Sequence, residues 1–215
     1  MRKKIVFLLI TMVMALTMSS TAEAKKGFYM GLGTAYNSIL GDFNGTAVLR
    51  GESEVIILPD VNNAFGIDLR AGYGINDQWA VELNLMSSEH SGTWEGIRGN
   101  LSYVSFSVNG KYSFTSSSTT QPYLLFGLSG NTLLIKDGAT DISTGEVSDA
   151  TLSGPGFNFG VGVEDYFTPN VSFNVSIMYR YVDYTSASGV NESGSIDDGI
   201  SGSGLSFLLT TAYHF

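Results

Sequence analysis

Apolar and polar residues alternate with a period of two over much of the chain after residue 24. In the last eleven residues, Leu205 to Phe215, one set of alternate positions is nearly all apolar and the other is mostly small or polar. Successive side chains of a strand point to opposite faces of a sheet, so this segment is predicted to be a strand with one apolar face. No apolar run after residue 24 is long enough for a transmembrane helix. The pattern therefore indicates an all-β chain.

The same alternation defines eight segments, which we predict as the antiparallel strands of an up-and-down transmembrane β-barrel. They are Phe28 to Tyr36, Phe65 to Ile75, Trp79 to Met86, Leu101 to Phe114, Pro122 to Gly130, Phe157 to Tyr166, Val171 to Val182 and Leu205 to Phe215. Strands of about ten residues are long enough to cross a bilayer when tilted. Since a barrel in lipid leaves no strand edge unpaired, the last segment is expected to pair with both the first and the seventh.

Alternation alone does not say which face of the barrel points inward. A soluble barrel of lipocalin type would carry its apolar face inside. An eight-stranded barrel has an interior only just wide enough for its side chains. The apolar set contains several Phe, Tyr, Trp or Leu side chains from nearly every strand, whereas the other set is rich in glycine. The apolar side chains are too bulky to share the interior, so their volume favours an apolar exterior that faces lipid.

Aromatic residues fall near the two ends of the predicted strands and are expected to form a girdle at each membrane interface. The girdle positions are Phe28, Tyr36, Phe65, Tyr73, Trp79, Tyr112, Phe114, Tyr181 and Phe207. The connections alternate in length, with short turns on the side of the termini. The four longer connections are Asn37 to Ala64, Ser88 to Asn100, Asn131 to Gly156 and Asp183 to Gly204. Short periplasmic turns and long extracellular loops are typical of outer-membrane barrels.

The N-terminus reads as a signal peptide over residues 1–24. Arg2 to Lys4 form a charged region, Ile5 to Met18 form an apolar run, and Ala22 to Ala24 form a small-residue cleavage pattern. The alternative, a retained membrane helix, is disfavoured because the apolar run is shorter than the roughly 20 residues that span a bilayer. We expect an exported barrel domain over residues 25–215.

Two internal segments resemble a known family. The segment GFNFGVGVEDYFTPNVSFNVSIMYRYVDY, Gly156 to Tyr184, is similar to the last hairpin of the OmpA-like and opacity-protein-like family of eight-stranded outer-membrane barrels. QPYLLFGLSG, Gln121 to Gly130, resembles a strand of the same group, and the terminal Tyr213 and Phe215 resemble its end signal for the outer-membrane assembly machinery. The resemblance implies a location in the bacterial outer membrane, in contact with its lipid and lipopolysaccharide. These motifs belong to the fold and imply no activity.

Charge and cysteine content exclude several classes of function. The chain contains no cysteine, which excludes disulfide scaffolds and thiolate chemistry. Without Arg2, Lys3, Lys4 and Glu23 of the leader, 8 basic and 19 acidic residues remain, a net charge of −11. This charge disfavours nucleic acid as a partner. It falls in the outer loops, where it favours divalent cations or a basic ligand from a host or another cell, or serves only to keep the surface solvated.

Six charged residues fall on the predicted lumen face. They are Asp68, Arg70, Glu82, Lys111, Glu164 and Arg180. Three are acidic and three are basic, so we expect them to neutralise one another, as charges removed from water must. The resemblance implies a polar network that plugs the lumen or opens as a narrow gated pore. A static network that fixes strand register is the interpretation that the charges favour.

The leading functional interpretation is a monomeric, non-enzymatic surface protein, an adhesin, surface antigen or envelope-integrity protein, whose acidic loops carry its role. The first alternative is a narrow channel or transporter for small or apolar solutes. The second is a lipid-modifying enzyme, for which His90, beside Ser88, Glu89 and Ser91, is the candidate base. Sequence neighbours do not make a catalytic triad, which is recognised by geometry. No residue pattern predicts a metal or cofactor site.

Overall fold

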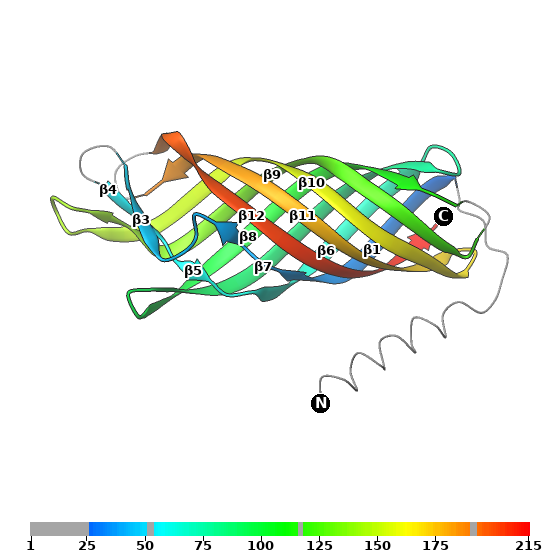
Figure 1. Ribbon diagram of the computed structural model, residues 1–215, viewed down its shortest axis with the longest axis horizontal. Coiled ribbons are helices and arrows are strands. Elements are labelled where there is room, and N and C mark those ends of the chain that lie inside the picture. The colour runs from blue at the N-terminus through cyan, green and yellow to red at the C-terminus, as the bar shows by residue number, and fades with distance from the viewer. Residues whose placement is uncertain (1–25, 51–53, 116–117, 190–192) are drawn as a thin grey trace, which may run out of the picture.

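The computed structural model describes residues 26–50, 54–115, 118–189 and 193–215. The predicted signal peptide lies outside these residues. Within them, eight long strands run obliquely along the molecule (Figure 1). They are β1 (Gly27–Asn37), β6 (Ala64–Gly74), β7 (Trp79–Trp94), β8 (Ile97–Ser113), β9 (Thr120–Asp141), β10 (Val147–Thr168), β11 (Val171–Ser188) and β12 (Ser193–His214). Four short strands lie between β1 and β6: β2 (Leu40–Gly41), β3 (Thr46–Arg50), β4 (Glu54–Leu58) and β5 (Asp60–Val61). No helix among the described residues is long and apolar enough to cross a bilayer.

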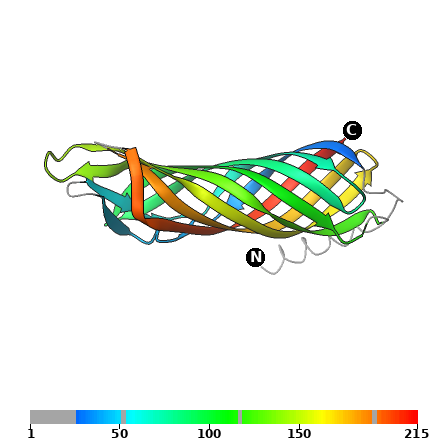
Figure 2. The ribbon, with the colours of Figure 1, turned by 90° about the horizontal axis from the view of Figure 1, so that it is seen from above.

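The eight long strands close into an antiparallel barrel. Each pairs with the next along the chain, and β12 pairs with both β11 and β1. Tyr213 is opposite Val171 on one side and Met30 on the other. Two views at right angles show tilted strands on every side (Figure 2). The predicted fold class and the closing role of the last strand are confirmed.

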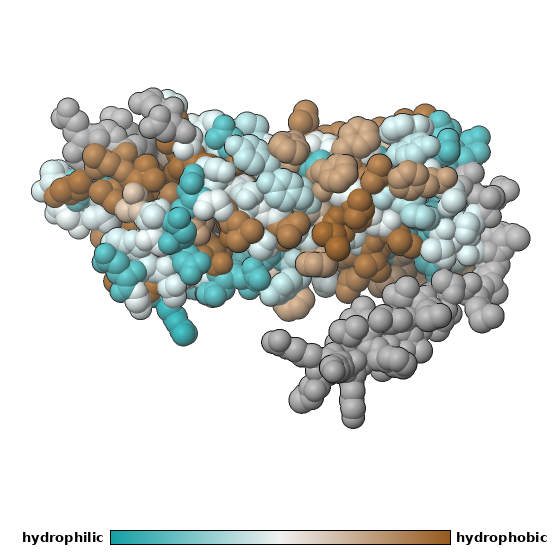
Figure 3. Space-filling view, viewed as in Figure 1, coloured by the Kyte–Doolittle hydropathy of each residue, from teal (hydrophilic) through white to brown (hydrophobic). Residues whose placement is uncertain are grey.

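The apolar face of the barrel points outward over the half that carries the C-terminus. On β11, Val175, Ile177 and Tyr179 are exposed, whereas Asn174 and Ser176 at alternate positions are buried. Figure 3 shows hydrophobic side chains gathered over this half of the molecule, with a second hydrophobic area at the opposite end. The outward apolar face that volume predicted is confirmed, and lipid is the solvent that suits it.

Aromatic side chains lie at both rims of this outward apolar face. We call the part of the barrel between the two rims the membrane belt. All nine predicted girdle residues lie on the exterior, exposed or half-buried. At the rim beside the termini, the rings of Trp79 and Tyr112 lie 4.8 Å apart. At the other rim, the rings of Tyr36 and Phe65 lie 4.9 Å apart. Amphipathic rings favour the level of lipid headgroups, so these two rims bound the part of the wall that faces hydrocarbon.

The strands continue far beyond the outer rim. β9, β10 and β12 each contain 22 residues, about twice the number that a tilted strand needs to cross a bilayer. Much of what the sequence predicts as the second, third and fourth loops is therefore paired strand. We call this part, residues 88–103, 131–154, 182–189 and 193–204, the outer extension.

The outer extension inverts the polarity of the wall. Beyond Tyr181 on β11, Val182 and Tyr184 point inward and are buried, while Asp183 and Thr185 take the outward positions. Water surrounds this part of the barrel, so the apolar side chains gain by facing inward. Most of the buried apolar core accordingly fills the lumen at this end, and Leu125, Met178 and Leu208 extend it into the belt.

The first outer connection folds back into this core. β2 pairs with β12, β5 pairs with β7, and the β3–β4 hairpin joins the wall through β4 and β9. Ile56 and Leu58 of β4 are 1% and 0% exposed. Ile39, Phe43 and Val61 are buried in the same cluster. This segment therefore closes the outer end of the barrel with its apolar side chains.

Deleting Phe215 tests the closing strand. Its amide donates to the carbonyl of Phe28 at 3.0 Å, and the two rings lie 5.6 Å apart. Because these contacts tie the last residue across the seam, we expect the deletion to lower the amount of folded barrel in the membrane several-fold. The measurement is heat-modifiable gel migration of membrane fractions. Phe114→Ala, which removes another exposed aromatic at the same rim, is the matched control and should leave that amount near normal. Equal amounts for the deletion and the intact chain would contradict the assigned role.

Candidate functional site

All six predicted lumen charges lie inside the barrel and are buried. They come from β6, β7, β8, β10 and β11, because each occupies an inward position of the alternation. The lumen within the membrane belt is therefore polar, while the sheet separates its charges from lipid.

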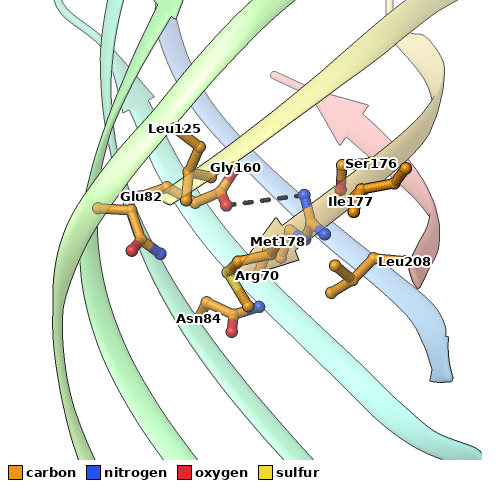
Figure 4. A pocket seen from close by; sticks show the side chains of 10 residues that line it. Arg70, Glu82, Asn84, Leu125, Gly160, Ser176, Ile177, Met178 and Leu208 are labelled. Carbon is orange, nitrogen blue, oxygen red and sulfur yellow. Dashed lines mark ion pairs between the residues drawn. The ribbon is translucent and has the colours of Figure 1, made fainter. Parts of the chain in front are cut away.

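Asp68, Arg70 and Glu82 form one cluster. The Nε of Arg70 donates to Oδ2 of Asp68 at 2.6 Å, and its Nη1 lies 3.7 Å from Oε1 of Glu82. Figure 4 shows this second ion pair as a dashed line between two side chains of the neighbouring strands β6 and β7. Thr210 donates its hydroxyl to Asp68 at 2.8 Å, and Asn84 donates its amide to the same carboxylate. One cation thus serves two buried carboxylates, supported by neutral donors.

Lys111 and Glu164 form a second cluster nearer to the termini. The Lys111 ammonium lies 2.5 Å from Oε2 of Glu164 and 4.5 Å from the centre of the Tyr123 ring. Ser172 donates to the other carboxylate oxygen at 2.6 Å, and Nε2 of His214 lies 3.4 Å from it. The carboxylate is therefore satisfied from both sides, as a buried ion must be.

Arg180 differs from the other five charges. Among the described residues it has no carboxylate within ion-pair distance, so the charges that the sequence predicts to neutralise one another do so here in sum and not pair by pair. Its guanidinium donates to the hydroxyls of Tyr103 and Ser206, the latter at 2.7 Å, and lies 4.9 Å from the centre of the Tyr103 ring. The Asp68 cluster has two carboxylates and one guanidinium. Its extra negative charge balances the charge of Arg180 only when the whole lumen is counted.

Tyrosines complete these clusters and were not singled out from the sequence. Tyr29 donates its hydroxyl to Glu82 at 3.0 Å, and Tyr123 donates to Asn174 at 2.6 Å. Both occupy inward positions of their strands. A large polar aromatic among small inward residues is the signal that could have identified them.

The lumen is filled with side chains along its length. The cavities enclosed by the Arg70, Lys111 and Arg180 regions measure about 10, 30 and 10 Å³. A cavity needs roughly 10–15 Å³ to hold a single water molecule. Each of these three spaces is therefore no larger than a few water molecules.

His90 and Ser88 lie together at an inward position just beyond the outer rim. Nδ1 of His90 donates to the carbonyl of Asn62 at 2.9 Å, and Nε2 lies 2.8 Å from the Ser88 hydroxyl. Both side chains are buried. Glu89 points to the opposite face, where it accepts from Ser102 at 2.7 Å. The sequence neighbours therefore do not form a triad.

The outer end carries an apolar row across four strands. Leu49 of β3 is opposite Val55 of β4, Val55 is opposite Thr140 of β9, and Thr140 is opposite Val147 of β10. Leu49 and Val147 are exposed, and Ile142 beside them is exposed too. Within the described residues β3 pairs only with β4, so its other edge has no strand partner among them. We call this surface, formed by Leu49, Val55, Thr140 and Val147, the tip row.

Comparison with known proteins agrees with this architecture. Residues 5–215 match the family model described as the outer membrane protein beta-barrel domain. A "22 kDa outer membrane protein" from Rhizobium leguminosarum bv. viciae is 27% identical over 183 residues, which cover 83% of this chain and 73% of that protein.

Three solved structures share the fold. Neisserial surface protein A has a TM-score of 0.61 and 18% identity, covering 88% of this chain and 98% of its own. OprG from Pseudomonas aeruginosa has a TM-score of 0.60 and 17% identity, covering 91% and 99%. Ail, the attachment invasion locus protein of Yersinia pestis, solved with the heparin analogue sucrose octasulfate, has a TM-score of 0.52 and 16% identity, covering 89% and 100%. At these identities the likeness is one of fold.

The contrast between Arg70 and Arg180 gives a stability prediction. Arg70→Met leaves the carboxylates of Asp68 and Glu82 buried without their cation, and breaking such a pair costs about 3–5 kcal/mol. Arg180→Met leaves no buried carboxylate without its cation and removes only charged hydrogen bonds to two hydroxyls, so we expect a smaller cost of about 1.5–3 kcal/mol. Urea unfolding in lipid vesicles measures both. Equal losses of unfolding free energy in the two variants would show that the charge of Arg180 is compensated by a nearby group.

The filled lumen gives a conductance prediction. Because the three cavities beside Arg70, Lys111 and Arg180 measure only about 10 to 30 Å³, the barrel in a planar bilayer should show no stepwise conductance above the lipid baseline. Single-channel recording at both polarities is the measurement. Steps well above that baseline would contradict a filled lumen.

Proposed function

The chain belongs to the outer membrane protein beta-barrel domain family and lies in the bacterial outer membrane, and from this premise we propose that it is a surface protein whose outer end binds another protein. An adhesin-like role fits this interpretation best. The observation that carries it is the tip row, because it presents apolar side chains and an unpaired strand edge at the end farthest from the membrane.

The free edge of β3 supports binding of an extended segment. An unpaired strand offers backbone donors and acceptors to another chain, and alternate side chains then supply specificity. Leu49, 60% exposed, lies on this edge strand, in register with Val55 and through it with Thr140. A partner strand added beside β3 would continue the sheet and cover the apolar row.

Charge selects the chemistry of the partner. Asp137, Glu146 and Asp149 are exposed on the β9–β10 hairpin, next to the tip row. Like charges repel, so a polyanion of the kind bound to Ail is disfavoured here, and a segment with basic and aliphatic residues is favoured. The acidic loops predicted from sequence would therefore surround the apolar contact and favour a partner that carries basic residues beside its aliphatic ones.

The two alternative functions have weaker support. A transport role needs a path, and the side chains that fill the lumen leave only isolated small cavities. An enzymatic role needs a base that reaches its substrate, whereas His90 and Ser88 are buried inside the wall and bonded to Asn62. We therefore assign His90 a structural role, in which it fastens the first outer connection to β7.

Selection from a displayed library of random linear peptides tests the proposal, with the barrel held in lipid nanodiscs. We expect enriched peptides to alternate aliphatic and basic residues, because such a strand matches both the row and its acidic surround. Leu49→Asp and Val147→Asp should weaken binding of an enriched peptide about tenfold, or about 1.4 kcal/mol.

Ile97→Asp is the matched control, because Ile97 is 67% exposed on the neighbouring β7–β8 hairpin but lies outside the row. It should leave peptide binding unchanged. Enriched peptides that are acidic, or that bind Leu49→Asp as well as the original chain, would overturn the proposal.

A further inference from the structure

The first outer connection, which carries β2 to β5, is attached to β7 over a short stretch beside His90. β5 pairs with β7 through two residue pairs. Directly after β5, the backbone amide of Asn62 donates to the carbonyl of Ser91 at 2.8 Å. The carbonyl of Asn62 accepts from Nδ1 of His90 at 2.9 Å. The ring of His90 therefore supplies one hydrogen bond of this attachment from inside the barrel.

The hydrogen bonds of His90 suit a neutral ring. A backbone carbonyl can only accept, so the proton of the neutral ring lies on Nδ1, which faces Asn62. Nε2 lies 2.8 Å from the hydroxyl of Ser88, which donates to it. Both ring nitrogens are thus satisfied without a charge. A second proton on Nε2 would remove this acceptor and force the hydroxyl of Ser88 to turn.

The surroundings of His90 are unfavourable for a charged ring. His90 is 3% exposed, and the residue opposite it on β8 is Leu101, which is 0% exposed. Ser88 is opposite Tyr103, whose hydroxyl accepts from the guanidinium of Arg180. A protonated ring would therefore stand in an apolar part of the lumen that already holds one cation.

The groups around the ring act on its pKa in both directions, and burial has the largest effect. Burial lowers the pKa of His90, and the charge of Arg180 lowers it further, whereas the carbonyl of Asn62 and the carboxylate of Glu89 raise it. Glu89 points to the opposite face of β7 and accepts from Ser102. The other charged side chains of the adjoining outer segments are exposed: Asp60 of β5, Arg98 of β8 and Lys136 of β9.

We propose that this attachment is a pH-sensitive switch, closed while His90 is neutral and released when His90 is protonated. Among the described residues, no carboxylate lies within ion-pair distance of the ring to stabilise its charge in place. Separation of Asn62 from the ring would let water reach the charge. The released segment carries β3 and β4, so acid outside the cell would loosen the outer end of the barrel. The switch is independent of what the tip row binds.

The direction of the pH dependence follows from the lowered pKa. In the released state the ring is in water and has the ordinary histidine pKa of about 6.5. In the attached state the pKa of His90 is lower. The attached state therefore keeps its full stability above about pH 6.5 and loses stability as the pH falls below that value.

Hydrogen–deuterium exchange of the barrel in lipid nanodiscs tests the switch, read on residues 54–62 at about pH 7.5 and about pH 5. Each rate is divided by the rate of an unstructured peptide at the same pH. We expect protection of this segment to fall about tenfold in acid, because one unit of pKa difference changes the ratio of the two states tenfold. Residues 157–163 of the membrane belt should keep their protection.

Two variants assign the effect to one ring. His90→Gln keeps a donor for Asn62 but takes up no proton, so residues 54–62 should stay protected at both pH values. His214→Gln is the matched control, because His214 is the second of the two histidines of the chain and lies at the opposite rim. This variant should lose protection in acid as the original chain does.

NMR of ring-labelled histidine follows the protonation of His90 directly, with its signal identified as the one that remains in His214→Gln. Protonation and loss of protection should share one midpoint, a comparison that holds even where His90→Gln disturbs the attachment at neutral pH. Equal protection of the original chain at both pH values would overturn the proposal. So would acid loosening that persists in His90→Gln, or two separate midpoints.

Discussion

The structure depends on one constraint: inside the bilayer every backbone N–H and C=O must find its partner within the sheet. Closure of β12 on β1 removes the last free edge. The register irregularities of the wall fit the same constraint. They lie at Ser148/Ala150, Ser153/Gly156, Tyr166/Thr168 and Tyr184/Ser186, outside the membrane belt or at its periplasmic rim. Water can satisfy a displaced backbone group in those places, whereas lipid cannot.

The barrel wall contacts lipid in one half and water in the other. Its apolar side chains point outward in the first half and inward in the second. Within the belt, lipid takes the apolar face and the charged clusters of Arg70 and Lys111 remain inside. Beyond the rim, water takes the polar face and apolar side chains such as Tyr184 and Leu58 fill the lumen. The interior is therefore closed twice, by hydrogen-bonded charges in one half and by an apolar core in the other. Passage through such an interior would need both to be displaced.

The sequence predicted the strands of the belt because alternation there is strong and bulky residues leave only one choice of face. It did not predict the outer extension, since Asp183 to Gly204 contains mainly Gly, Ser and Asp, whose turn propensity hides a weaker alternation of opposite sense. The six lumen charges could be placed on the inner face from period alone. Their pairing could not, because the contacts of Arg180 depend on which residues of distant strands, Tyr103 and Ser206, share its height in the barrel.

Arg180 stands at the boundary between the two halves of the lumen, and its contacts suit both. Its guanidinium donates to Ser206 and Tyr103 and also reaches the sulfur of Met86 at 3.8 Å, beside the apolar core. A planar, weakly hydrated cation stacked on a tyrosine is the charged group best suited to such a boundary. The contacts of Arg180 and of the two charged clusters together link strands from all round the barrel, which favours a role in fixing their register. With the interior devoted to register and closure, the groups left free to bind are those of the outer extension and its rim.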